Sequence, residues 1–406
     1  MDLCAMALPL RPSLAILVAT TATGPLALNI FHPSMPGLVA VFDTSYAMVQ
    51  LTLTLYLLAM AFSQLVYGPL ADRYGRRITM LWGLGLYVAG SIMATVAPTL
   101  PLLLAGRVVQ AAGGIAGMVI ARAMVRDLYD RERSAGVIAY ITMAMVVAPM
   151  LAPTIGGFLD VHLGWRSSFA FVAIFGGVVM AFAVFNLPET LKEAAALPNM
   201  AEMVRGYGRL MREPAFVGYA FQAAFSTAIF FSFITASPFI IINLMGLPPS
   251  AFGLLFVMVS GGFMAGNFAA TRASRRIGSH RTIAIGIGFA VVGIAIMAAL
   301  ALGGVFTSLA LFGPMMAVAF GNGLSLPNAM AGIVSVNPRL AGTASGLGGF
   351  IQMGLGSGAT FLVGSLQGTT QMPVIAVMTV GVVFSALSYW LATWGNRRPA
   401  PHGQGA

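Results

Sequence analysis

The stretch Gly68-Pro69-Leu70-Ala71-Asp72-Arg73-Tyr74-Gly75-Arg76-Arg77 separates two long apolar runs and decides the fold. Glycine permits a tight turn between two helices. An acid near a helix N-terminus is stabilised by the helix dipole, and arginines can pair with carboxylates on neighbouring helices. Because the acid, the glycines and the arginines occur together and in this order, they predict a structured junction between two helices rather than a loop that is merely basic.

The composition places the flanking runs in a membrane. Hydrophobic residues make up 58% of the 406 residues and charged residues only 8%, against about 25% charged in ordinary soluble domains. Apolar runs of about 20 residues, long enough to cross the hydrocarbon region, recur from end to end. They are continuous rather than alternating, so the backbone is expected to satisfy its hydrogen bonds within helices. We therefore predict an all-α membrane protein.

About twelve spans are predicted, near 13–33, 46–70, 78–97, 100–123, 134–158, 167–187, 215–243, 250–271, 281–302, 307–335, 341–365 and 371–394. We expect two six-helix bundles, 1–187 and 215–396, joined by a polar linker over 188–214 and followed by a tail over 397–406. A weak internal repeat supports two halves. Gly75-Arg76-Arg77 follows the second span, and Arg275-Arg276-Ile277-Gly278 follows the eighth.

The positive charges lie in alternate loops. The formal net charge is +10, and the arginines that carry this pattern are Arg73, Arg76, Arg77, Arg126, Arg131, Arg133, Arg205, Arg209, Arg212, Arg272, Arg275, Arg276, Arg281, Arg397 and Arg398. The other loops contain almost nothing positive except Arg166. This distribution follows the positive-inside rule and predicts that both termini are cytoplasmic. It argues against nucleic-acid binding, which would place the charges along one face. The lone cysteine, Cys4, allows no intrachain disulfide.

Two further motifs lie within predicted spans. Arg107 and Gln110, followed by Gly113-Gly114, lie in the fourth span, where a charged side chain is costly unless it is paired or hydrated. We expect Arg107 to face a cavity; the alternative is a side chain that extends to the interface. The fifth span contains Pro149, Pro153, Gly156 and Gly157. Prolines bend a helix, and small residues allow close packing against a neighbouring span.

Together these motifs resemble the major facilitator superfamily. The residues Gly68, Asp72, Arg73, Gly75, Arg76 and Arg77 are similar to its loop signature, the Arg107 and Gln110 segment to its second signature, and the proline and glycine segment to its antiporter signature, with alanine in place of two glycines. The resemblance implies that the loop latches the two halves in the outward-facing state. It makes Asp72 and Arg76 latch residues, with Asp127 as a candidate partner of Arg76.

Further segments resemble one branch, the bicyclomycin and chloramphenicol resistance group of bacterial drug:proton antiporters. These are Ala121–Asp127, Phe320–Gly323 with Pro327-Asn328, Ala341–Gly346, and Pro33 with Pro36. The resemblance covers nearly the whole chain. It implies export of small hydrophobic drugs across the inner membrane, coupled to protons, by a protein that we expect to be a monomer in the lipid bilayer.

The chain departs from that branch at its expected proton site. Asn29 stands in the first span where those proteins carry an aspartate, and every acidic residue lies in a predicted loop or at a helix end. His32 is the one side chain within an apolar span that ordinarily titrates near neutrality. His32 is therefore a candidate coupling residue, the alternatives being a purely structural role for it and coupling through Asp43. The missing carboxylate, together with Arg107, predicts a cavity that prefers neutral or weakly anionic cargo, with Asn29, His32, Arg107 and Gln110 lining it.

Other functions stay open on the sequence. The chain could export a native metabolite such as a sugar or an amino acid, or be a transport-inactive membrane sensor. An enzyme would need a nucleophile with a base, a metal cluster or a nucleotide loop, and no HExxH, CxxC or GxxxxGK[ST] pattern occurs. We therefore expect no catalytic residue, no metal and no cofactor.

Overall fold

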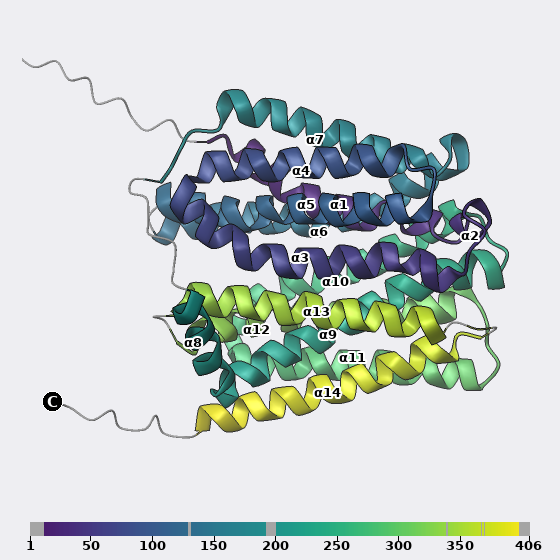
Figure 1. The fold of residues 1–406 in the computed structure, drawn as a ribbon. Coiled ribbons are helices and arrows are strands. Elements are labelled where there is room, and N and C mark those ends of the chain that lie inside the picture. Colours follow the sequence, from purple (N-terminus) through teal and green to yellow (C-terminus); the bar gives the residue numbers. More distant parts are fainter. Residues whose placement is uncertain are drawn as a thin grey trace, which may run out of the picture.

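The computed structural model describes residues 12–397 apart from 129–130, 192–199, 338–339, 367 and 369. That part of the chain is a bundle of helices without strands (Figure 1). The helices are α1 (Leu14–Asn29), α2 (Leu38–Val41), α3 (Tyr46–Tyr74), α4 (Arg76–Thr95), α5 (Leu100–Leu128), α6 (Arg131–Leu163), α7 (Arg166–Asn186), α8 (Met200–Met211), α9 (Pro214–Phe239), α10 (Pro249–Ile277), α11 (Ser279–Leu302), α12 (Ser308–Ser335), α13 (Ala341–Leu366) and α14 (Met372–Arg397), with a 3₁₀ turn η1 (His32–Ser34) and a π-helical turn η2 (Ile240–Leu244).

The predicted all-α membrane fold with about twelve spans is confirmed. Within the described residues, eleven helices are long and apolar enough to cross a membrane. A shorter apolar stretch, Val147–Leu163 in α6, lies where the fifth of the twelve spans was predicted. The first span ends in the η1 turn, which contains Pro33, because proline cannot donate the backbone hydrogen bond that would continue the helix. Within the predicted polar linker the structure has an amphipathic helix, α8, for which the sequence analysis made no prediction.

The helices form two groups that face each other (Figure 1). Helices α1 to α7 pack among themselves, as do α9 to α14, and the two groups meet mainly where α3 contacts α13 and α6 contacts α10. We call these groups the N-terminal and the C-terminal half. One end of the bundle carries α8 and the end of α14, and the opposite end carries α2; we call these the α8 end and the α2 end. The predicted domain boundaries themselves stay a prediction.

The two basic junctions of the internal repeat have the same backbone geometry. Gly75 joins α3 to α4 with φ 100° and ψ 150°, and Gly278 joins α10 to α11 with φ 83° and ψ 157°. Residues other than glycine rarely adopt a positive φ. A single glycine therefore reverses the chain at equivalent points of the two halves.

Candidate functional site

Arg107 lies fully enclosed within the N-terminal half. It is 0% exposed, and its guanidinium carbon lies 4.0 Å from the centre of the Tyr56 ring on α3. Its Nη1 donates to the Ala27 carbonyl at 2.9 Å and to Gln110 Oε1 at 2.6 Å. Phe31 and Phe169 present their rings to the same guanidinium at 5.5 and 5.7 Å. The arginine thus joins α5 to α1, α3 and α7.

The charge of Arg107 is balanced by dipoles and aromatic faces. Both ion pairs described in the structure centre on Arg76, so neither includes Arg107. Its Nε and Nη2 atoms are buried without a hydrogen-bond partner among the described residues. A buried cation that no carboxylate neutralises projects a positive potential into its surroundings, because the low dielectric of the interior screens it weakly.

Gln110 extends this polar cluster to α4. Its amide Nε2 donates to Ser91 Oγ at 2.8 Å, while its Oε1 accepts from Arg107. Gln110 is 0% exposed, so both of its polar ends are satisfied inside the half. The residue therefore holds the Arg107 side chain in one orientation relative to α4.

Asn29 and His32 lie at the end of the first span. The Asn29 amide donates to the Pro25 carbonyl at 2.8 Å, and His32 Nδ1 lies 2.9 Å from the Asn29 carbonyl. Since a carbonyl only accepts, Nδ1 carries the proton and Nε2 of the neutral ring is an acceptor. Asn29 Oδ1 and His32 Nε2 are buried without hydrogen-bond partners in the described part of the chain. The Nε2 atom of His32 is therefore a buried acceptor without a donor among the described residues.

The predicted latch residues Asp72 and Arg76, at the α8 end, form ion pairs within their own half. Arg76 pairs with Asp72 at 2.5 Å and with Asp127 Oδ2 at 3.0 Å. Its side chain is 8% exposed and that of Asp127 is 25% exposed, so this pair is shielded more than a surface salt bridge. The structure thus brings Arg76 and Asp127 together as the resemblance implied. Arg73 is exposed at the end of α3, and a β-carbon on Gly68, inside α3, would meet no neighbouring atom.

Two residues after α7 complete this junction, and the sequence reasoning missed both. The Glu189 carboxylate accepts from the backbone N–H groups of Arg76 at 2.9 Å and Arg77 at 3.1 Å, which caps the start of α4. A β-carbon on Gly75 would collide with that carboxylate. Thr190 donates to Asp127 Oδ2 at 3.2 Å. The start of the linker is thereby fixed to the α3–α4 turn.

At the α2 end, hydrogen bonds join the two halves. Tyr46 Oη and Gln50 Nε2 on α3 both donate to the Thr235 carbonyl on α9 at 3.1 Å. One turn deeper, the hydroxyls of Thr54 and Thr360 lie 2.8 Å apart. All five of these residues are buried. The halves are consequently closed against each other at this end.

The predicted antiporter segment lies where α6 meets α10. Pro149 and Pro153 are inside α6, and Thr154 donates to the Gly253 carbonyl of α10 at 3.0 Å. A β-carbon on Gly156 would collide with the Ile30 carbonyl, whereas one on Gly157 would lie 2.9 Å from the Pro249 carbonyl. The first glycine therefore packs α6 onto its own half, and the second packs it onto the other half.

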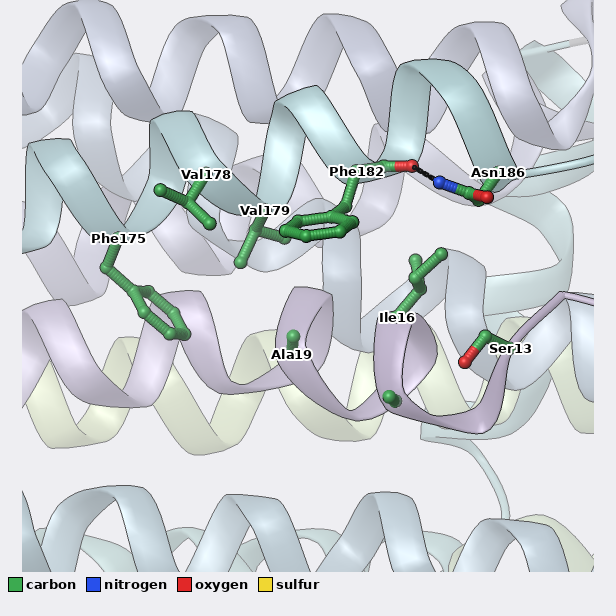
Figure 2. Close-up of a pocket in the computed structure, with 9 residues that line it drawn as sticks. Ser13, Ile16, Ala19, Phe175, Val178, Val179, Phe182 and Asn186 are labelled. Atoms are coloured by element: carbon green, nitrogen blue, oxygen red, sulfur yellow. Dashed lines mark hydrogen bonds between the residues drawn. The ribbon is translucent and has the colours of Figure 1, made fainter.

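A separate groove of about 490 Å³ lies away from these residues. Figure 2 shows Ile16 and Ala19 of α1 facing Phe175, Val179 and Phe182 of α7 across it. Its lining is mostly apolar, and it lies on the side of the N-terminal half remote from α13 (Figure 1). Its lining residues belong to α1, α7 and the positions at their ends, so it lies within the N-terminal half rather than at the boundary between the halves.

The sequence of the chain also matches the model of a known protein family. Residues 17–361 match the model of the Major Facilitator Superfamily. The chain belongs to that superfamily.

Relatives within the superfamily cover nearly the whole chain. The bicyclomycin resistance protein homolog of Haemophilus influenzae is 30% identical over 380 residues, which is 92% of this chain and 94% of the relative. The chloramphenicol resistance protein of Pseudomonas aeruginosa is 29% identical and aligns over 93% and 90% of the two chains. Multidrug resistance protein D of Escherichia coli is 29% identical over 85% and 86%. The predicted resemblance to this branch is confirmed.

Solved structures agree on the fold. The Escherichia coli xylose transporter, in a partially occluded inward open conformation, superposes with a TM-score of 0.74 over 97% of this chain and 98% of that chain, at 11% identity. The crystal structure of a D-xylose-proton symporter gives a TM-score of 0.75 at 12% identity, over 97% and 99% of the two chains. Family and fold are those of a transporter rather than an enzyme.

Proposed function

We propose that this superfamily member exports small hydrophobic drugs from the cytoplasm across the bacterial inner membrane by alternating access. The names of its relatives, two antibiotic resistance proteins and a multidrug resistance protein, support this cargo class. The arginines between α3 and α4, between α10 and α11, and in α8 lie at the α8 end. By the positive-inside rule that end is cytoplasmic, and the α2 end faces outward. The protein acts as a monomer.

The single observation that carries the cargo preference is the buried, carboxylate-free surroundings of Arg107 in the described chain. A cation that enters the space between the halves meets an opposing potential, while a neutral or weakly anionic drug does not. We therefore propose a preference for phenicol-like compounds over ethidium-like cations. Asn29, His32 and Gln110 shape the same region, and Asp72, Arg76 and Asp127 serve the cytoplasmic gate.

The proton is the proposed coupling ion. Asn29 cannot titrate, so the role passes to His32, whose Nε2 is buried without a partner among the described residues. Protonation would turn that nitrogen from an acceptor into a donor, next to the Arg107 cluster. The coupling site and the cargo-sensing charge would then lie within one half of the protein.

A resistance profile tests the proposal. A pump-deficient bacterium that expresses this chain should tolerate more chloramphenicol than the same strain with empty vector, and no more ethidium. Uptake into inverted vesicles should need an imposed pH gradient. Absence of resistance to every compound, with the protein present in the membrane, would refute drug export. Strong ethidium resistance that requires a residue between the halves would refute the charge argument.

A further inference from the structure

Two glycine junctions at the α8 end, one in each half, share a backbone geometry and differ in charge. Gly75 is the single residue between α3 and α4, and Gly278 is the single residue between α10 and α11. We name these turns the N-terminal and the C-terminal junction. Because each joins two helices that are long and apolar enough to span the membrane, both junctions lie at the membrane surface, among the phospholipid headgroups.

The N-terminal junction is neutralised by carboxylates of its own half. Arg76 pairs with Asp72 and with Asp127. The Glu189 carboxylate accepts from the backbone N–H groups of Arg76 and Arg77. Here the protein itself supplies the anionic groups that the arginines and the start of the second helix attract.

The C-terminal junction is basic and has no carboxylate in its half. The last acidic residue of the sequence is Glu213, so the half that begins with α9 contains no aspartate or glutamate. A β-carbon on Gly278 would meet no neighbouring atom, whereas one on Gly75 would collide with the Glu189 carboxylate. The arginines of the C-terminal junction are exposed, and none takes part in an ion pair of the described chain; they are Arg272, Arg275, Arg276 and Arg281.

Exposed apolar side chains lie beside these charges. The guanidinium carbon of Arg272 lies 3.9 Å from the centre of the Phe268 ring, and Phe268 is 63% exposed. Ile277, directly before the glycine, is 37% exposed. Positive charge next to an apolar surface complements a phospholipid, which has a phosphate and acyl chains. A free phosphate ion would use the charge alone.

We infer that the C-terminal junction binds the headgroup of an anionic phospholipid from the cytoplasmic leaflet. The lipid phosphate lies at the start of α11 as the Glu189 carboxylate lies at the start of α4, and the exposed arginines supply charge-assisted hydrogen bonds to its oxygens. The acyl chains lie along the apolar side chains next to the junction. The inference rests on the proposed cytoplasmic orientation of the α8 end and does not depend on the cargo.

A lipid titration of the purified full-length protein, followed by native mass spectrometry in an uncharged detergent, tests this site. The measured quantity is the dissociation constant of the first bound phosphatidylglycerol. Each arginine near an anionic surface contributes about a 5-fold factor in affinity, so Arg275→Gln combined with Arg276→Gln should weaken binding about 30-fold. The matched control replaces Arg205 and Arg209 by glutamine. These are exposed arginines of α8 with Glu202 about one turn away, and their loss should weaken binding by no more than about 3-fold.

A second variant separates loss of the site from misfolding. Ser279 is exposed in the first turn of α11, and Ser279→Asp places a carboxylate beside the arginines. It should weaken phosphatidylglycerol binding about 5-fold, as expected for one opposing charge. Without lipid it should raise the temperature of unfolding, because an acidic side chain at a helix start is stabilised by the helix dipole.

Four results would overturn the inference. Equal weakening by the junction pair and the α8 pair would show diffuse attraction, and phosphatidylcholine binding as tight as phosphatidylglycerol would show that charge is not recognised. Inorganic phosphate that binds as tightly, and depends equally on Arg275 and Arg276, would identify a site for a free anion. Unchanged lipid binding in the junction pair would remove the site altogether. The titration uses no drug, so normal lipid binding by a chain that exports no drug would refute only the proposed function.

Discussion

Replacing Arg107 by glutamine should change cargo selectivity more than it changes stability. The substitution removes two hydrogen bonds from Nη1, each contributing about 1.5–3 kcal/mol when the donor is charged. It also removes the contact with the Tyr56 face, which contributes about 2 kcal/mol when desolvated. Against these losses, it relieves the cost of burying a charge without an ionic partner, which is several kcal/mol. The opposing terms leave a folded protein.

The electrostatic effect has no such compensation. A monovalent cation about 8 Å from the guanidinium, at an effective dielectric constant of about 20, is opposed by roughly 2 kcal/mol. That energy corresponds to about a 30-fold change in affinity. Arg107→Gln should therefore raise the affinity for an ethidium-like cation by up to about 30-fold relative to a phenicol.

Binding to the purified protein, measured for one cationic and one neutral compound, gives the ratio directly. Arg107→Lys is the matched control, because it keeps the charge and loses the planar fork that bonds Ala27 and Gln110. Its selectivity should stay close to that of the unsubstituted protein. Equal cation-to-neutral ratios in the glutamine and lysine variants would show that the charge of Arg107 does not act on the cargo.

Three further results are expected. Asp127→Asn removes the ion pair at the α8 end and weakens the acceptor of Thr190, so thermal unfolding of the purified protein should show a loss of about 1–3 kcal/mol; an unchanged transition would mean that the pair does not stabilise this state. In the Cys4→Ser background, oxidation of Thr54→Cys with Thr360→Cys should stop drug export, and a reductant should restore it, whereas export by fully crosslinked protein would exclude opening between these helices. His32→Ala should abolish uptake driven by a pH gradient in inverted vesicles, and retained gradient dependence would transfer the coupling role to Asp43 or another group.

The fold was predictable because each span is decided locally. A run of about 20 apolar residues has one stable conformation in a membrane, and the predicted and observed spans agree within a few residues for most helices. The motif from Gly68 to Arg77 also predicted its own turn, since the positive φ of Gly75 is a property of one residue. The pairing of Arg76 with Asp127 followed from the family resemblance.

Glu189 could not be found in this way. In the sequence it is one of several charged residues in a polar linker. Its role as the cap of α4 exists only because the end of α7 lies beside the α3–α4 turn, more than a hundred residues away along the chain. The one local signal was its place directly after Pro188, where the last apolar run of the N-terminal half ends.

The sequence by itself determined the class of molecule, the number of spans and the residues that carry charge, because hydrophobicity and turn chemistry act over short distances along the chain. Only the tertiary structure decided which polar atoms are satisfied. Gln50 and Gln64 are the same residue type on the same helix, yet one finds the Thr235 carbonyl and the other finds no acceptor among the described residues. That difference arises from how two halves distant in sequence pack against each other, and hydrogen bonding depends on distances that no local pattern contains.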